Sequence, residues 1–347
     1  MAAEANAEAV PVGGSPWLLA WRRLRRNRMA LGFGVLFLLI VAFVLAAPLW
    51  AGEVAHTGPN KNHTLEKVDA GGEQREVVNR EGRPIGPQWL EAGGRFFLGA
   101  DGRLGRDEMV RLMYGGRISL LIGIASALIT VLLATVLGLL AGYYRGWTDT
   151  VISRALDVVW AFPVMLLAIA LGVSLAVGGL QIGPLHLSGG SIWIPILIIG
   201  CVSVPYIARP LRGQVLSLRE KEFIEAAVAQ GAGPLRVMFG ELLPNLSSTI
   251  IVFFTLTIAN NMLLEAALSF LGVGVQPPNS SWGTMIAGGF DLLTSAPLLT
   301  IVPSTMIFLT VLSINVFGDG LRDALDPNSK LRLEAHAGMA EPEGSAV

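Results

Sequence analysis

Six long apolar stretches constrain the fold of this chain more than any other feature of its sequence. A helix that crosses a bilayer needs about 20 apolar residues, because backbone N–H and C=O groups find no water partners in hydrocarbon and must pair within the helix. The stretches that approach or meet this requirement are residues 31–50, 118–142, 158–177, 192–207, 250–270 and 298–317. The sequence therefore predicts an all-α integral membrane protein with six transmembrane helices.

The composition agrees with this prediction. Of 347 residues, 52% are hydrophobic and 15% are charged, whereas an ordinary soluble domain has about 25% charged residues. Five arginines precede the first stretch, but its apolar part is longer than the roughly 7–15 residues of a cleavable signal peptide, so we expect a retained anchor. Pro195 and Pro205 lie within the fourth stretch and predict a kink there.

Several functional classes lack support in the sequence. The formal net charge of −1 gives no reason to expect nucleic acid as a partner. The chain contains no Gly-Lys pair, hence no phosphate-binding P-loop, and its four histidines lack the i,i+4 spacing of a helical metal site. The single cysteine, Cys201, excludes an intramolecular disulfide, and we expect it to be a small buried residue. The sequence thus predicts no catalytic residue, no cofactor and no metal site.

Lysines and arginines in the short loops predict the orientation, because cytoplasmic loops carry an excess of them. With the N-terminus in the cytoplasm, the outer loops 178–191 and 271–297 hold no Lys or Arg. The long outer loop holds ten, but loops of more than about 60 residues largely escape the rule. Four of its arginines approach the second span, and we expect neighbouring Asp101, Asp107 and Glu108 to neutralise them by pairing; the four are Arg103, Arg106, Arg111 and Arg117.

The predicted spans divide the chain into five parts. Within the outer loop, residues 53–94 are rich in Gly, Pro and charge and predict a solvated insertion, whereas residues 97–117 look ordered. Residues 333–347 are rich in Ala, Glu and Gly and predict a disordered tail. The five parts are a basic cytoplasmic N-terminal tail (1–30), a first transmembrane anchor (31–50), an extracytoplasmic loop (51–117), a five-helix core (118–317) with a long cytoplasmic loop (208–248), and a cytoplasmic C-terminal tail (318–347).

The cytoplasmic loop 208–248 is the most informative segment. Its sequence predicts two short helices separated by Gly231, Gly233 and Pro234, with a sharp turn at Gly231, where glycine can adopt φ > 0. Pro244 predicts a kink or a restart before the fifth span. A helix with small residues on one face can enter a groove on another protein, since alanine and glycine allow close backbone approach. An ordinary amphipathic loop helix is the alternative.

The pattern Glu-Ala-Ala, three residues, Gly, and later Leu-Pro resembles the cytoplasmic coupling motif of ABC importer permeases. Further segments are similar to the dipeptide, oligopeptide and nickel permease group, and the resemblance covers nearly the whole chain from residue 98 to 327. Glu241 departs from the motif, which tends to be apolar there. The motif residues are Glu225, Ala226, Ala227, Gly231, Leu243 and Pro244. The further segments are LGADGRLGRDEMVRLMYGGRISL (98–120), GLLAGYYRGWTDTVISRALDVVWAFP (138–163), EAALSFLGVGVQPPNSSWGTMI (265–286) and FGDGLRDALDP (317–327).

This resemblance implies the type I ABC importer fold and a heteromeric machine. Such a permease pairs with a homologous permease subunit to form the channel, with two cytoplasmic ATPase subunits, and with an extracytoplasmic binding protein that delivers the solute. The motif residues would couple the permease to the ATPases, which hydrolyse the ATP. Peptides are the common cargo of the group, and nickel complexes or another small solute are the alternative. A secondary transporter is an alternative of a different class, although the paired inverted repeats common in such proteins are not evident here.

Outside the motif, acidic residues near the spans are further candidates. Glu265 lies late in the fifth span, and intramembrane carboxylates usually face a cavity or a partner, so Glu265 is a candidate for the substrate path. Solvation near the outer interface is the alternative. Arg154 and Asp157 are one helical turn apart and predict an ion pair. Four residues just past the sixth span predict either a solvated cap or a second ATPase contact: Asp319, Arg322, Asp323 and Asp326.

Overall fold

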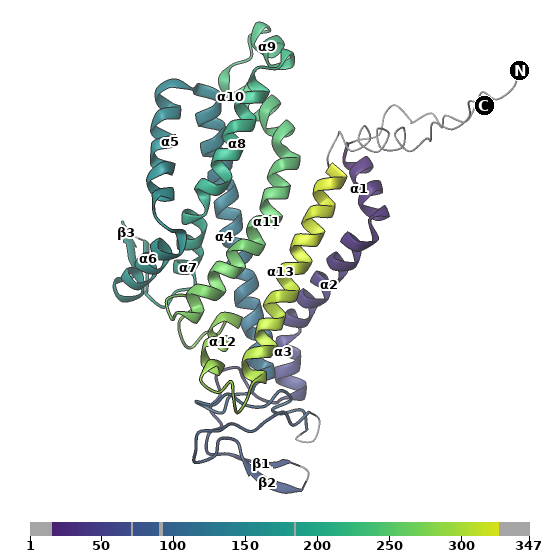
Figure 1. The fold of residues 1–347 in the computed structure, drawn as a ribbon, viewed down its shortest axis with the longest axis vertical. Coiled ribbons are helices and arrows are strands. Elements are labelled where there is room, and N and C mark those ends of the chain that lie inside the picture. Colours follow the sequence, from purple (N-terminus) through teal and green to yellow (C-terminus); the bar gives the residue numbers. More distant parts are fainter. Residues whose placement is uncertain (1–15, 71, 90–92, 184, 326–347) are drawn as a thin grey trace, which may run out of the picture.

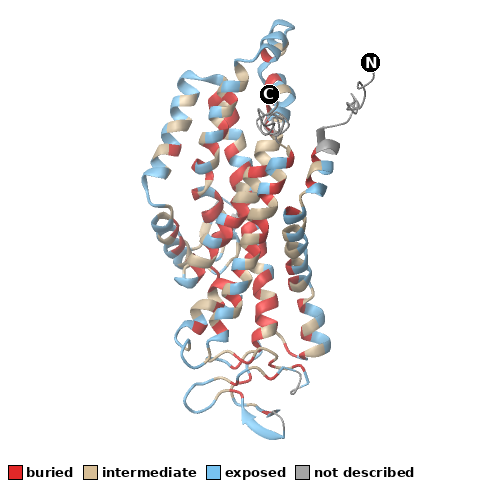
Figure 2. Ribbon diagram, turned by 45° about the vertical axis from the view of Figure 1, so that its right-hand side comes forward, coloured by how far each residue is buried: buried red, intermediate tan, exposed pale blue. Residues whose placement is uncertain are grey.

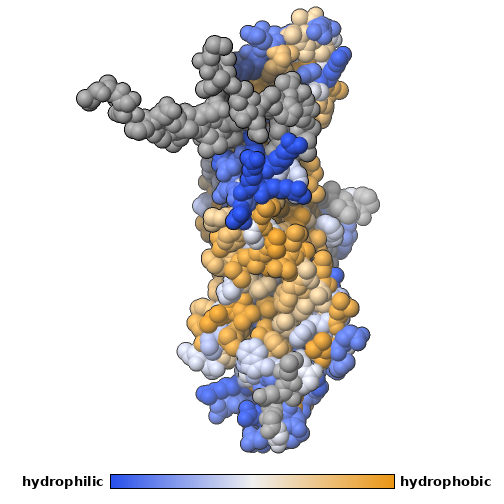
Figure 3. Space-filling model, turned by 90° about the vertical axis from the view of Figure 1, so that its right-hand side faces the viewer, coloured by the Kyte–Doolittle hydropathy of each residue, from blue (hydrophilic) through white to orange (hydrophobic). Residues whose placement is uncertain are grey.

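Helices dominate the described part of this computed structural model, which comprises residues 16–70, 72–89, 93–183 and 185–325 (Figure 1). Four helical segments are long and apolar enough to cross a membrane singly, and each of two bent helix pairs is so when its two helices are counted as one span. The described helices can therefore make up to six crossings. Figure 3 shows the matching surface, a broad apolar band between hydrophilic ends. The helical segments that can cross a membrane singly are Arg28–Val54, Glu108–Tyr144, Pro234–Phe270 and Leu298–Leu325.

The bundle is built around helix α4 (Glu108–Tyr144), which packs against α8 (Val204–Arg219) and α11 (Leu243–Phe270). A Cβ atom at Gly138 of α4 would lie 3.1 Å from Cβ of Leu211 and 3.2 Å from the carbonyl oxygen of Ala208. Small residues at such contacts let helix backbones approach closely in a membrane, where packing rather than water exclusion drives association. Accordingly, buried residues line the inner faces of these helices and exposed residues line the outer faces (Figure 2).

A second pair of long helices packs beside this core. Helix α2 (Arg28–Leu45) continues through α3 (Ala47–Leu49) and a π-helical stretch, η1 (Trp50–Val54), and it packs along α13 (Leu298–Leu325). Asn27 caps α2, because its side chain accepts a hydrogen bond of 3.0 Å from the backbone N–H of Ala30. The short helix α1 (Pro16–Arg26) packs on the far end of α13.

Residues 158–177, predicted as the third span, do not form one straight helix. Its residues belong to α5 (Gly146–Ala161) and α6 (Val164–Gly178), which meet at an angle of 85°. Pro163 causes the break, since a proline disfavours the helical conformation of the residue before it, and Phe162 is extended with φ −91° and ψ 137°. The pair therefore turns through about a right angle, with α5 beside α8 and α4 and with α6 beside α7.

The predicted kink in the fourth span is confirmed. Helices α7 (Trp193–Val202) and α8 meet at 41°, with Pro205 in the first turn of α8. A short hairpin of β3 (Leu180–Ile182) and β4 (Leu185–Leu187) precedes α7. Cys201 was expected to be buried, but its side chain is exposed on the bundle surface. Apolar character alone could not separate the inner from the outer face of this helix, because both faces are apolar.

The predicted solvated insertion, residues 53–94, is instead part of a small folded unit, which we call the loop unit (residues 55–107). Strands β1 (Lys67–Ala70) and β2 (Glu73–Glu76) pair antiparallel within it. A separate apolar cluster forms the interior of this unit. Its members are Val68 of β1, Val77, Ile85, Phe96 and Ala100. The cluster joins residues far apart in the sequence, which is why local composition did not predict it.

The loop unit is also held by charged groups. His63 is buried and its Nε2 lies 2.7 Å from the Thr57 hydroxyl, while its Nδ1 lies 2.8 Å from the Glu66 carboxylate. Arg95 donates a 2.8 Å hydrogen bond to the same carboxylate, and this bond lowers the pKa of Glu66 below its usual value. These contacts tie residues 57–66, at the start of the unit, to Arg95.

The junction of the loop unit with α4 confirms part of the predicted charge pairing. Asp101 pairs with Arg106 at 2.6 Å and with Arg111 at 3.9 Å. Asp107 does not pair with an arginine as predicted. It caps α4 instead, by accepting a 3.0 Å hydrogen bond from the backbone N–H of Val110. Helix α4 therefore starts at Glu108, well before the apolar stretch that marked it in the sequence.

Helix α12 (Trp282–Phe290) closes the loop-unit end of the bundle. It packs against α13, α11 and α4. Trp282 is fully buried, and its indole N–H donates a 2.9 Å hydrogen bond to the carbonyl oxygen of Leu112. Helix α1 and the end of α13 lie at the opposite end of the molecule (Figure 1).

Candidate functional site

The predicted coupling loop forms a short helix, α9 (Glu222–Ala229), that stands beyond the ends of the long helices (Figure 1). Ile224 is its buried anchor, packed in a cluster with residues of α4, α8 and α11. Of the motif residues, Glu225 and Ala226 are exposed and Ala227 is half-buried. The helix is thus fixed on one face and presents small and acidic residues on the other.

The turn after α9 depends on Gly231. Its φ is +84°, so the predicted positive φ is confirmed. The backbone N–H of Gly231 donates to the carbonyl oxygen of Val228 at 2.9 Å, and that of Ala232 donates to Ala227 at 3.0 Å. A left-handed glycine that closes the last helical turn in this way is a common helix end. In the described part of the chain, no neighbouring side chain or distant backbone atom lies within 4 Å of a Cβ built at Gly231, so backbone conformation rather than crowding is what favours glycine.

The second short helix and the restart at Pro244 are corrections to the sequence prediction. Helix α10 (Pro234–Arg236) runs through a π-helical stretch, η2 (Val237–Leu242), into α11 without a break. Pro244 lacks an N–H to pair with the carbonyl four residues earlier, and the wider π turns accommodate this defect. Asn245 donates a 2.7 Å hydrogen bond to the carbonyl oxygen of Glu241. Of the motif pair, Leu243 is half-buried and Pro244 is exposed.

Large apolar side chains surround the motif at the α9 end. Phe223, Val228, Leu235 and Phe239 are between 40% and 66% exposed. Phe223 and Val228 lie on α9 itself, whereas Leu235 and Phe239 follow in α10 and η2. Exposed apolar side chains on a protruding element are typical of a protein interaction surface. We call this set, together with Glu225, Ala226, Ala227 and Gly231, the α9 surface. Sequence reasoning found the motif but missed these apolar side chains.

Ion pairs connect α8, which leads into α9, with α5 and with the α4–α5 turn. Arg145, in the α4–α5 turn, pairs with Glu220 at 2.6 Å. Arg212 of α8 donates two hydrogen bonds of 2.5 Å to the carboxylate of Asp149 in α5. Such bidentate pairs are geometrically specific. The helix α8 that leads into α9 is therefore joined to the short arm α5 and to the end of α4.

The predicted ion pair of Arg154 with Asp157 is confirmed at 3.6 Å. Asp157 also accepts a hydrogen bond from Arg209 of α8, which the sequence did not predict because the two residues are 52 positions apart. The guanidinium of Arg209 lies 3.6 Å from the centre of the Trp160 ring. Asp157 thus links α5 to α8 a second time.

Glu265 lies inside the bundle, so solvation near the interface, the alternative considered for it, is wrong. Its side chain is 1% exposed and accepts hydrogen bonds from Ser119 at 3.0 Å and from Ser269 at 2.7 Å. The Ser119 hydroxyl also accepts from the backbone N–H of Trp282 at 3.2 Å, and the Ser269 hydroxyl accepts from Val275 at 3.0 Å. The carboxylate therefore joins α11, α4 and α12. Ser119 is 146 residues away, so no local pattern could reveal the network.

The C-terminal charged residues are only partly described. Asp319, Arg322 and Asp323 are exposed on the last turns of α13. Asp326 lies outside the described residues, as do residues 1–15 of the predicted N-terminal tail and residues 326–347 of the predicted C-terminal tail.

A multi-pass helical bundle with a protruding, partly apolar surface defines a membrane-embedded subunit that engages another protein. A family model described as the binding-protein-dependent transport system inner membrane component matches residues 134–330, and the N-terminal TM domain of oligopeptide transport permease C matches residues 15–65. The chain belongs to this family of binding-protein-dependent transport permeases.

Relatives and a solved structure agree. The chain is 37% identical over 316 residues to the glutathione transport system permease protein GsiD of Pectobacterium atrosepticum, with 91% of this chain and 92% of the relative covered. It is 38% identical over 317 residues to the di/tripeptide transport system permease protein DppC of Pseudomonas aeruginosa, covering 91% and 93%. The oligopeptide transport system permease protein OppC of Haemophilus influenzae is 34% identical over 323 residues, covering 92% and 90%.

The fold resembles that of the MetNI methionine ABC transporter in an inward-facing conformation. The TM-score is 0.51 at 17% sequence identity, and the match covers 63% of this chain and 97% of the solved one. The predicted fold class, the type I ABC importer fold, is thereby confirmed. The chain is a multi-pass inner-membrane permease subunit of an ABC importer, a machine in which partner subunits hydrolyse ATP and a binding protein supplies the solute. This assignment replaces the secondary-transporter alternative.

Proposed function

We propose that this permease forms half of a channel for peptides, together with a homologous permease subunit. Relatives named for dipeptides, oligopeptides and glutathione support this cargo class, because each of these solutes is a peptide. The single observation that carries the proposal is the similarity over nine-tenths of the chain to permeases with such names. Nickel complexes or another small solute are the alternative cargo.

The α9 surface is the proposed docking site for an ATPase subunit. Its small residues would enter a groove, while Phe223 and Val228 would contact apolar walls and Glu225 would lie at the rim. Motion of the docked ATPase would reach the bundle by two routes. One is the unbroken helix from Pro234 to Phe270, and the other is the pair of Asp149 with Arg212. Leu243 and Pro244 lie on the first route.

We also propose that the α9 end faces the cytoplasm. Helix α1 and the end of α13 lie at this end (Figure 1), and five arginines cluster in and directly after α1. An excess of arginine is typical of the cytoplasmic side. The N-terminus would then be cytoplasmic and the loop unit extracytoplasmic. Exposed apolar side chains on the long helices would contact lipid or the second permease subunit.

Glu265 remains a proposed residue of the substrate path. In this conformation its carboxylate is enclosed by Ser119, Ser269 and α12. Access to a solute would require α11 and α12 to separate during transport, as alternating access through rearranged helices would allow. The buried carboxylate would then face the opened path.

The cargo proposal is tested by uptake in cells that lack this chain. Deletion should abolish uptake of labelled di- and oligopeptides, and re-expression should restore it. Uptake of labelled nickel is the parallel measurement. Restored nickel uptake with unchanged peptide uptake would replace peptides by the alternative cargo. Pull-down of ATPase subunits with the tagged chain tests the proposed partners in the same cells.

A further inference from the structure

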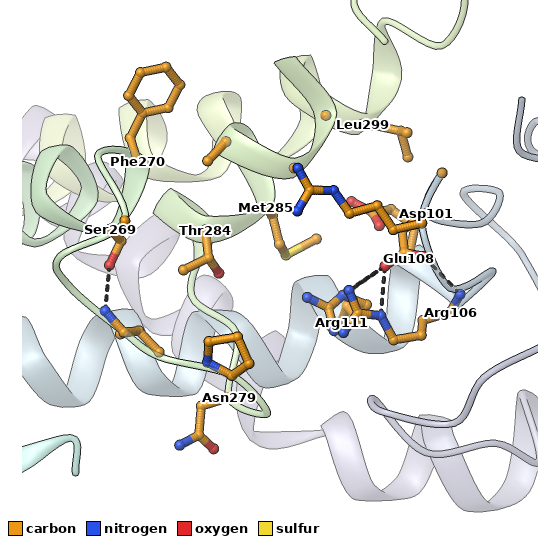
Figure 4. Close-up of a pocket in the computed structure, with 18 of the residues that line it drawn as sticks. Asp101, Arg106, Glu108, Arg111, Ser269, Phe270, Asn279, Thr284, Met285 and Leu299 are labelled. Atoms are coloured by element: carbon orange, nitrogen blue, oxygen red, sulfur yellow. Dashed lines mark hydrogen bonds and ion pairs between the residues drawn. The ribbon is translucent and has the colours of Figure 1, made fainter. Parts of the chain in front are cut away.

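A partly open cavity of about 270 Å³ lies where the loop unit meets the bundle. Its walls come from the loop unit, from the start of α4, from α12 and from the segment that follows α11. Figure 4 shows its two unlike ends, with Asp101, Arg106 and Arg111 on one side and Ser269 and Phe270 on the other. The cavity is thus charged at one end and neutral at the other.

The charged end carries more positive than negative groups. Arg103, Arg106 and Arg111 line it, together with Asp101 and Glu108. Three guanidinium groups against two carboxyl groups leave one positive charge even when both carboxyl groups are ionised. Arg103 is exposed, and no carboxylate among the described residues pairs with it. The lining therefore favours an anionic ligand.

Arg111 is the least satisfied of these groups. Asp101 is committed mainly to Arg106, from which it accepts a 2.6 Å hydrogen bond, and to the backbone N–H of Leu104 at 2.9 Å. Arg111 lies 3.9 Å from Asp101, beyond hydrogen-bond distance, and makes one hydrogen bond of 3.3 Å, to the carbonyl oxygen of Pro59. A guanidinium has five N–H donors, and the side chain of Arg111 is only 7% exposed. Most donors of this buried cation therefore lack an acceptor in the part of the chain that the structure describes, which is costly unless a ligand supplies one.

The shape of the site indicates which anion. The N–H groups of a guanidinium form a fork that matches the two oxygens of a carboxylate, and one negative charge balances the excess of the lining. At the neutral end, Gln276 and Asn279 supply amide groups that can contact a peptide bond. Ser269 lines the cavity and also donates to Glu265, the proposed residue of the substrate path. The cavity therefore suits the carboxylate end of a peptide and adjoins the proposed path.

We propose that this cavity binds the carboxy-terminal carboxylate of a peptide at Arg111 and Arg103 and holds its last residues toward Phe270. This inference rests on the proposed function, because it assumes that peptides reach the loop-unit end of the permease. It adds a recognition step in the permease itself, for solutes that carry a free carboxy terminus.

The test uses the complete purified importer in lipid nanodiscs, without its binding protein. Labelled dialanine is compared with dialanine amide, which lacks the carboxylate, and with N-acetyl-dialanine, which keeps the carboxylate and lacks the ammonium group. Wild-type importer should bind the amide roughly tenfold or more weakly than dialanine, the loss expected for a hydrogen bond to a charged group. It should bind N-acetyl-dialanine at least as tightly as dialanine. Equal binding of dialanine and its amide would overturn the inference.

Two arginine variants locate the site. Arg111→Gln should abolish the preference for dialanine over its amide. Arg103→Gln should weaken dialanine binding by a smaller factor, because solvent screens an exposed charge. Since Arg103 is exposed, this variant decides the question where Arg111→Gln does not assemble. Dialanine binding at the wild-type level in the arginine variants that assemble would contradict the inference.

Glu108→Gln separates an anionic from a cationic ligand. It removes a negative charge from the lining, so it should bind dialanine at least as tightly as the wild type does, and weaker binding would overturn the inference. Arg75→Gln is the matched control for the arginine variants, because Arg75 is an exposed arginine of the same loop unit, in β2, and does not line the cavity. It should bind all three probes as the wild type does. Thermal unfolding of each variant controls for folding.

A second arm measures docking of the binding protein to the importer. If dialanine and its amide bind alike, but Arg111→Gln weakens this docking, the cavity takes an acidic side chain of the binding protein and the inference is wrong. Uptake of dialanine by wild-type importer with its binding protein and ATP is measured in parallel. If uptake proceeds while the binding experiments fail, only this inference fails. If the importer carries another solute and no peptide, the proposed function fails as well.

Discussion

Gly231 places a left-handed backbone at the exposed end of α9, next to the residues proposed to meet the ATPase. A β-branched residue in this conformation is strained by roughly 1–3 kcal/mol. Because no described neighbour contacts a Cβ at Gly231, the strain would act on the turn and not on the bundle. The residue therefore allows docking to be tested separately from folding.

We expect Gly231→Val to insert normally into the membrane and to lose ATPase subunits, or to hydrolyse ATP without uptake. Gly231→Asn should retain most function, since asparagine tolerates positive φ better than other residues. Glu225→Lys should act in the same direction as Gly231→Val but more weakly, because solvent screens an exposed charge. The measurements are uptake, pull-down of the ATPase subunits and abundance in the membrane. Wild-type uptake by Gly231→Val with normal ATPase retention would remove α9 as a coupling element.

Glu265→Gln tests the proposed path residue. The amide keeps the size of the side chain and can still accept a hydrogen bond from one serine, so assembly should remain intact. Uptake should fall if the charge faces the opened path. The comparison with Ser119→Ala separates the two roles, because that change weakens the network but keeps the carboxylate. If Glu265→Gln takes up a range of solutes at the wild-type rate, Glu265 has a structural role and is not part of the substrate path.

At the scale of elements, the short arm α5 is held to α8 by apolar contacts of Leu156 and Ile152 and by two ion pairs. The pair of Asp149 with Arg212 is mostly buried, with side chains 18% and 32% exposed. Arg209 forms the second link through Asp157. The ion pairs add to the apolar contact of Leu156, so loss of one pair should loosen α5 without unfolding the bundle.

Asp149→Asn should therefore loosen α5 while the remaining helices stay folded. The loss of one charged, bidentate contact corresponds to about 1–3 kcal/mol locally. Hydrogen exchange should increase in α5, and ATP hydrolysis should become less tightly coupled to uptake. Asp319→Asn, an exposed carboxylate of α13, is the control. Equal exchange in α5 of wild type and Asp149→Asn would show that the pair does not hold the arm.

The loop unit should respond to acid through Glu66. Arg95 lowers the folded-state pKa of Glu66 below its ordinary value of 4.5. The ionised Glu66 carboxylate therefore stabilises the folded loop unit fully above pH 4.5. This stabilisation is lost as the pH falls through the lower pKa that Glu66 has in the folded state. Proteolysis of the loop unit should speed up in this range for the wild type. Glu66→Gln should show a smaller change with pH, and an identical pH dependence of the two proteins would contradict the assignment.

The sequence alone predicted the helices whose formation depends on local patterns of residues. Apolar stretches marked the helices that cross the membrane, and the Glu-Ala-Ala pattern marked α9. It failed where distant residues decide the structure. The apolar cluster inside the loop unit needs Phe96 beside Val68, and the Glu265 network needs Ser119 of another helix. The 85° break at Pro163 was missed because an apolar run hides a change of direction.

At the scale of the whole molecule, the proposed orientation makes one prediction about accessibility. Cys201 is exposed on an apolar helix and is the only native thiol, so Cys201→Ser should give a functional background. In that background, a cysteine replacing Gln74 of β2 should react with a membrane-impermeant thiol reagent in intact cells. A cysteine replacing Gln230, beside Gly231, should react only after permeabilisation. The reverse pattern would invert the proposed topology.

The unbroken helix from Pro234 to Phe270 has a consequence for the tolerance of this chain to insertions. Each residue of an α-helix turns the side chains by about 100°, so the angle between the α9 surface and Glu265 is set by the number of residues between them. One added residue would rotate Glu265 away from Ser119 of α4 even though every native residue is still present. Only the π-helical stretch Val237–Leu242 has wider turns that could absorb the change. The count of residues along this helix is therefore as much a part of the mechanism as their identity.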